Sequence, residues 1–160
     1  MICTSSHNDW LSDKYRTYSI SGNRGKDANY QGECYPELAP KLSFWKIWHD
    51  NIGKVSEEEN NMYYVKEYYE QVLSELDPKK VLKDLDNSVL LCYENHNEFC
   101  HRHIVAIWLE QTVGASTIEA KAKDNQIEMF ERPIYIKEYL ERAMNKDKPK
   151  ALKMSNYCKK

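Results

Sequence analysis

The sequence contains no long apolar stretch and carries little net charge. No segment approaches the roughly 20 consecutive apolar residues of a membrane-spanning helix, and the first ten residues, MICTSSHNDW, have neither the basic start nor the apolar core of a secretory signal. The formal net charge of -2 excludes a uniformly basic surface for nucleic acids or acidic membranes, so any anion binding must come from a local cluster. We therefore expect a cytoplasmic protein that does not contact a membrane.

Paired cysteines are also missing. The five cysteines are an odd number and lack the spacing of a secreted disulfide framework, which predicts free thiols. They are Cys3, Cys34, Cys92, Cys100 and Cys158. Neither a Cys-x-x-Cys nor a His-x-x-x-His pair is present to fix a chelating geometry.

The length of 160 residues suits one domain with a core of ordinary size. Residues 1–14 hold few apolar side chains and are predicted to be an N-terminal extension. Residues 146–160 are predicted to be a lysine-rich, solvated C-terminal tail. The domain itself is expected over residues 15–145.

Apolar periodicity predicts an α/β domain. Strands are expected at residues 17–21, which are rich in β-branched and aromatic side chains, and at residues 89–93, which begin with a short apolar run. Amphipathic patterns between capping residues predict helices at residues 40–53, 57–76, 78–85, 101–113 and from 133 onward. Residues 115–122 alternate loosely and suit an edge strand. The expected fold is a small, mostly parallel sheet flanked by helices.

Polar residues gather between the end of the second predicted strand and the start of the following helix. They are Cys92, Glu94, Cys100, His101 and Arg102. Loops at the carboxyl ends of parallel strands form the crevice in which ligands bind, and helix N-termini present free amides there. The glycine-rich loop at residues 22–32 follows the other predicted strand, with Ser21 before it and Arg24 within it. We expect both loops to line one crevice.

Two segments, CYE at residues 92–94 and EFCHRHIVAIWL at residues 98–109, resemble the bacterial family known as domain of unknown function 488. Three further stretches resemble that family in order and spacing: SISGNRG at 19–25, LAPKLSFWKIW at 38–48 and YVKEYYEQVL at 64–73. The resemblance covers about residues 15–114 and implies a small cytoplasmic α/β domain. It implies shared polar residues at Cys92, Glu94, Cys100, His101 and Arg102, with Ser21 and Arg24 as further members. The family resemblance implies a fold and a site but no substrate.

Two kinds of chemistry use the cysteines. Cys100, at a helix start, can be a nucleophile whose thiolate is stabilised by the helix dipole and by His101 and Arg102. Alternatively, the cluster supplies ligand types for zinc from Cys34, Cys92, Glu94, His96, Cys100 and His101. Adjacent Cys100 and His101 should point to different sides of a helix, which argues against chelation, so no metal cofactor is expected.

A third kind of chemistry is anion recognition without a covalent step, at Arg102, His101 and the helix amides, with Arg24 or Lys26. The leading hypothesis is a domain that binds or acts on an anionic ligand that contains a phosphate or a nucleotide, and this ligand is either a small molecule or a nucleic acid. Its catalytic residues are predicted to be Cys100, Glu94 and His101, and its ligand contacts Arg102, Arg24, Ser21 and Cys92. The alternative is a metal-stabilised or purely structural interaction domain, in which Arg102 pairs with Glu94 or Glu98 to fix the loop. The oligomeric state is left open.

Overall fold

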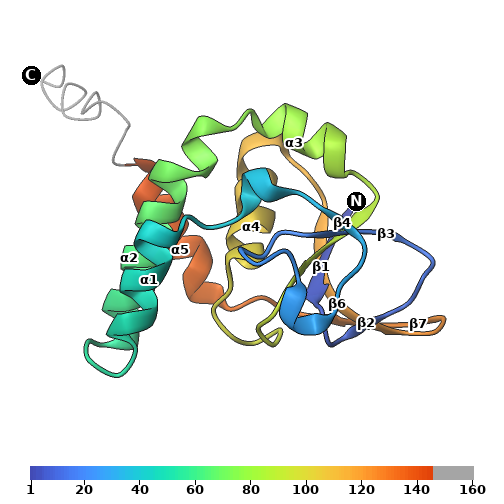
Figure 1. Cartoon of the computed structure of the whole chain (residues 1–160). Coiled ribbons are helices and arrows are strands. Elements are labelled where there is room, and N and C mark those ends of the chain that lie inside the picture. The colour runs from blue at the N-terminus through green and yellow to red at the C-terminus, as the bar shows by residue number, and fades with distance from the viewer. Residues whose placement is uncertain (146–160) are drawn as a thin grey trace, which may run out of the picture.

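The structure is a computed structural model that describes residues 1–145; the predicted tail at 146–160 lies outside the described residues. Its centre is one seven-stranded sheet with the order β2-β6-β1-β5-β3-β4, and β7 pairs with β6 (Figure 1). The strands are β1 (Ile2–Ser6), β2 (Trp10–Leu11), β3 (Arg16–Ser19), β4 (Glu33–Cys34), β5 (Ser88–Cys92), β6 (Thr117–Lys123) and β7 (Gln126–Phe130). Only the β6–β7 pair is antiparallel among these pairings, which confirms a mostly parallel sheet.

Five helices flank the sheet, as expected for an α/β domain. They are α1 (Leu42–Asn51), α2 (Glu57–Gln71), α3 (Pro78–Leu85), α4 (His101–Val113) and α5 (Ile134–Asn145). Their ends follow the capping residues in the sequence. The Ser56 hydroxyl accepts a hydrogen bond from the Glu59 amide at 3.1 Å, the Asp77 carboxylate accepts one from the Lys79 amide at 3.0 Å, and Gly114 ends α4 with φ of +65°.

The main core lies between the sheet and α4. Figure 1 shows α4 between the strands and a layer formed by α1, α2 and α5. Residues of α4 such as Ile104 and Leu109 are fully buried there against Ile2 and Leu90 from the central strands. This packing fixes the N-terminus of α4 next to the carboxyl end of β5.

The first strand corrects the prediction that residues 1–14 form an extension. Residues 2–6 are all buried, and β1 lies at the centre of the sheet, in parallel register with β5 from Cys3–Val89 to Ser6–Cys92. The prediction was wrong because Thr4, Ser5 and Ser6 look like surface residues in the sequence. Inside the sheet their small side chains are buried, and the Thr4 hydroxyl is satisfied by the Glu119 carboxylate.

The predicted edge strand at residues 115–122 is also corrected. It is β6, an interior strand that pairs with β1 and β2 along one side and with β7 along the other. Its polar residues suggested an exposed edge, but Glu119 is 2% exposed. A buried ion pair, described below, explains why a charged residue is tolerated at that position.

In the described part of the chain, no helix is long and apolar enough to cross a membrane.

Candidate functional site

A cavity of about 500 Å³ opens at the carboxyl ends of β3 and β5. Residues 21–23 and Asp27 line it from the first predicted loop, and residues 92–94 and 99–101 line it from the second. Trp45, Trp48 and other apolar side chains from α1 and α2 complete the wall. The crevice therefore lies between the two loops that the sequence suggested, where a parallel sheet is expected to bind ligands.

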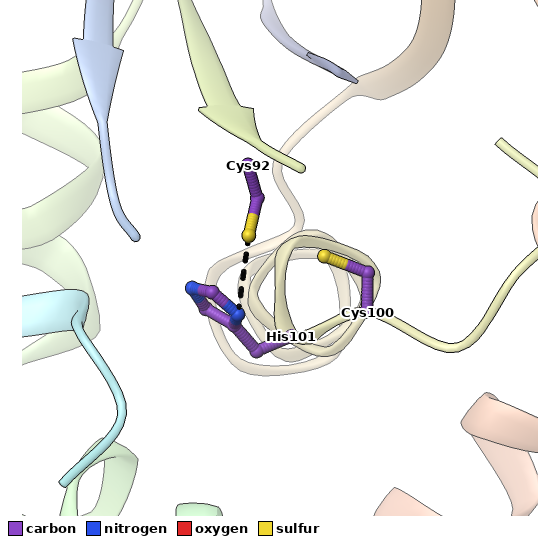
Figure 2. A group of neighbouring side chains, drawn as sticks. All are labelled: Cys92, Cys100 and His101. Atoms are coloured by element: carbon purple, nitrogen blue, oxygen red, sulfur yellow. Dashed lines mark hydrogen bonds between the residues drawn. The ribbon is translucent and has the colours of Figure 1, made fainter. Parts of the chain in front are cut away.

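Three reactive side chains converge in this cavity (Figure 2). Cys92 ends β5, Cys100 is the residue before α4, and His101 is the first residue of α4. Their two sulfur atoms and a His101 ring nitrogen all lie within 4.8 Å of one another. We call these three residues the thiol cluster.

The position of Cys100 corrects the expectation that Cys100 and His101 point to different sides of a helix. Cys100 caps α4 in an extended conformation, with φ of -154° and ψ of 143°, and so is not part of the helical turn. Its side chain and that of His101 therefore reach the same point, where they meet Cys92. Residue spacing in the sequence does not reveal this because it depends on the residue at which the helix begins.

Hydrogen bonds hold the His101 ring in one orientation. The His101 Nε2 atom lies 2.8 Å from the Ile20 carbonyl oxygen, which can only accept, so Nε2 carries a proton. The other ring nitrogen, Nδ1, faces the Cys92 sulfur at 3.6 Å. The Cys92 thiol also lies 3.5 Å from a carboxylate oxygen of Glu94. The cluster is thus extended by one carboxyl group.

The two thiols differ in acidity. The contact with Cys100, together with burial, holds the pKa of Cys92 well above its usual value. Burial alone would raise the pKa of Cys100, but its interactions with Cys92, Arg102 and His101 outweigh burial and hold that pKa well below the usual range. Burial, assisted by Cys100, raises the pKa of Glu94 to about 7. The cavity therefore contains one readily ionised thiol and one carboxyl group that titrates near neutral pH.

Arg102 is part of the buried core and does not line the cavity. Its guanidinium is fully buried and pairs with the Glu119 carboxylate, with N–O distances of 2.8 and 3.1 Å. Neither of the partners suggested by the sequence, Glu94 or Glu98, occupies that position. Arg132 binds the same Glu119 carboxylate at 3.1 Å. Glu119 and Arg132 could not be predicted from the sequence, because no local pattern links them to the cluster.

The two remaining predicted residues differ in position. Ser21 is 5% exposed and lines the cavity, whereas Arg24 is exposed and does not. The Ser21 hydroxyl lies 2.8 Å from that of Ser19, which lies 3.2 Å from the His7 ring. The His7 ring itself lies partly buried between Tyr30 and Tyr93. Only the fold reveals this chain of hydroxyls.

Comparison with models of protein families identifies the family of the chain. The model of the DUF488-N3a group, described as the active DUF488-N3 subclade, matches residues 10–113. No curated protein matches the chain, and no solved structure does. The matched span includes the first cavity loop, β5 and all of α4, and thus all residues of the thiol cluster. The chain therefore belongs to the DUF488 family.

Proposed function

We propose that this DUF488 domain is an enzyme that binds a small nucleotide-like ligand in the cavity and acts on it at the thiol cluster. The observation that carries the proposal is the convergence of Cys92, Cys100 and His101 within 4.8 Å in a cavity that Glu94 also lines. Clustered titratable side chains in a cleft are typical of active sites. The matched subclade is described as active, which agrees with an enzyme and names no reaction.

The cavity wall favours a flat heterocyclic group on the ligand. Trp45, Trp48 and Phe99 supply aromatic surface on which a ring can stack. Asp27 and Glu94 supply carboxylate oxygens that can accept hydrogen bonds from the amino groups of a nucleobase. A nucleoside or nucleotide combines both features.

The anionic part of the ligand has a different partner from the one that the sequence suggested. Arg102 is neutralised by Glu119, and Arg24 is exposed outside the cavity. We therefore place a ligand phosphate at the first-turn amides of α4, which begins at the cavity beside Cys100. Glu94 is the acid or base of the reaction, since it reaches both the cavity and the Cys92 thiol.

Two chemistries at the thiol cluster fit this function. Cys100 can attack the ligand as a thiolate, or the thiols can hold a metal ion that activates the ligand or a water molecule. The competing class is a structural interaction domain in which the cluster only fixes the loop before α4. Binding of a ligand in the cavity would distinguish the proposed enzyme from a structural interaction domain.

The test is titration of the full chain with adenosine, AMP, guanosine, GMP and inorganic phosphate, followed by tryptophan fluorescence. Trp45 and Trp48 line the cavity, so a stacked base should quench their emission. Glu94→Gln should weaken binding of the preferred nucleoside by about tenfold or more, because a hydrogen bond to a charged group contributes about 1.5–3 kcal/mol. Glu128→Gln, on exposed β7, is the control and should leave binding unchanged.

The ligand series also separates base recognition from phosphate recognition. Tighter binding of the nucleotide than of the nucleoside would support an anion site at α4. Equal affinities for the nucleoside and its nucleotide would mean that the site recognises the base and not the phosphate. Absence of quenching by every nucleoside and nucleotide would overturn the proposal in favour of the structural class.

A further inference from the structure

We infer that Cys92, Cys100 and His101 form a binding site for one zinc-class divalent ion. Among residues 1–145 they are the one group of His, Cys, Asp and Glu side chains whose ligand atoms converge in this way. Two sulfur atoms and an imidazole nitrogen are donors that zinc prefers. The inferred metal site lies in the cavity of the proposed function. Only the role given to Glu94 rests on that proposed function.

The spacing of the donors fits a tetrahedral ion. With Zn–S bonds of about 2.3 Å and Zn–N bonds of about 2.0–2.1 Å, a tetrahedral site keeps sulfur and nitrogen about 3.6 Å apart. The Cys92 sulfur and His101 Nδ1 are 3.6 Å apart, and the Cys100 sulfur lies within 4.8 Å of both atoms. Figure 2 shows all three side chains directed toward the same point.

The orientation of His101 is that of a metal ligand. A ligating histidine usually donates its second ring N–H to a carbonyl or carboxylate, which fixes the ring and leaves the other nitrogen free to bind. His101 Nε2 donates to the Ile20 carbonyl at 2.8 Å, and Nδ1 faces the two sulfur atoms. The hydrogen bond to the Ile20 carbonyl thus orients the His101 ring and leaves Nδ1 available to bind an ion.

The fourth position of the ion faces the cavity. The three ligands are 3–5% exposed and all line that cavity, so the ion would be shielded from bulk water on the protein side and accessible to a ligand on the other. Glu94 lies 3.5 Å from the Cys92 sulfur, where it can take the fourth position or accept a proton from a water molecule bound there. Two thiolates also neutralise a divalent ion, which lowers the cost of burying its charge. In this form the thiols are ligands, and Cys100 is not the nucleophile.

Metal content and cobalt substitution test the inference. The full chain, purified without chelator, should contain about one zinc ion per chain. After removal of zinc, Co²⁺ should produce the near-ultraviolet charge-transfer band of thiolate ligands and the intense visible bands of a tetrahedral ion. Cys92→Ser and Cys100→Ser should each weaken binding by more than the roughly 10–100-fold typical of a lost outer-shell partner. Cys34→Ser, which changes a cysteine outside the cluster, should bind like the original chain.

Alkylation of the unaltered chain guards against variants that fail to fold. Zinc should protect Cys92 and Cys100 from iodoacetamide and leave Cys34 reactive, as measured by mass spectrometry of peptides. The inference is overturned if Co²⁺ gives no thiolate band, or if zinc protects neither cluster cysteine. Nucleoside titrations of the metal-free and the metal-loaded chain keep the two proposals separate. If nucleosides quench the fluorescence but the chain binds no metal, only the metal site is refuted. If the chain binds metal but nucleosides quench neither the metal-free nor the metal-loaded chain, only the nucleotide-like ligand is refuted.

Discussion

Glu119 shows how one residue holds several buried groups in place. Its carboxylate accepts hydrogen bonds from Arg102, Arg132 and Thr4, and the side chains of Arg102 and Glu119 are 0% and 1% exposed. His103 is close by, with Nδ1 3.8 Å from the carboxylate. This contact is not an ion pair, since burial lowers the pKa of His103 to about 3 and the ring is neutral. The network therefore contains two guanidinium groups that depend on one carboxylate.

Glu119→Gln should destabilise the protein by about 3–5 kcal/mol, because it leaves buried guanidinium groups without a counter-charge. Urea denaturation followed by circular dichroism would measure the change. The matched control is Glu33→Gln, which breaks an exposed pair with Arg16 and should have a much smaller effect. Equal effects of the two substitutions would contradict the importance that we give to the buried pair.

At the scale of single elements, the ends of β5 and α4 determine the site. β5 ends at Cys92 and α4 begins at His101, with Cys100 as its cap. A helix that began one turn earlier would include Cys100 and turn its thiol away from His101. The amphipathic pattern of α4 predicts the helix, whereas its exact first residue depends on packing against the sheet.

The strand β1 should be indispensable for folding. A chain that begins at His7 lacks the partner of both β5 and β6 and also lacks Ile2, which is fully buried in the core. We expect this chain to show no cooperative unfolding transition in thermal or urea denaturation. Ile2→Val, which removes one buried methylene, should cost only about 0.5–1.5 kcal/mol. A cooperative transition in the truncated chain would restore the interpretation of the first residues as an extension.

At the scale of the whole molecule, the sheet brings together residues that are distant in the chain. His7 follows β1, yet its ring contacts Ser19 at the end of β3 and packs beside Tyr93 after β5. Burial, together with the positive charge of Arg102, lowers the pKa of His7 to about 4. The folded protein therefore keeps this imidazole neutral at pH values where the unfolded chain, with an ordinary histidine pKa of about 6.5, binds a proton.

The lowered pKa makes the contribution of His7 to stability depend on pH. Because the unfolded chain binds the proton more tightly, the contribution is fully present above about pH 6.5 and is lost as pH falls toward 4. His7→Asn should lower the unfolding free energy at pH 7, and the difference from the original chain should shrink toward pH 4. Urea titrations across this range in the presence of chelator would measure it. His49→Asn is the control for an exposed imidazole, and a difference that stays constant or grows at low pH would contradict the prediction for His7.

Local patterns in the sequence determined the five helices, the strands β3, β5 and β6, and the place of the site. Ser56 and Gly114 mark helix ends because their hydrogen bonds or backbone angles involve only neighbouring residues. The apolar run at residues 89–92 and the motif from Cys92 to Arg102 placed the crevice at one strand end, because parallel strands direct their carboxyl ends to the same edge.

The sequence by itself thus determined the α/β class, the family and the residues of the thiol cluster. Only the tertiary structure decided that Arg102 serves the core, that β1 lies at the centre of the sheet, and that Cys100 and His101 face one point. The physical reason is distance along the chain. A capping hydrogen bond joins residues that are only a few positions apart. The hydrogen bond from Thr4 to Glu119 joins residues that are 115 positions apart and can form only after the sheet has formed.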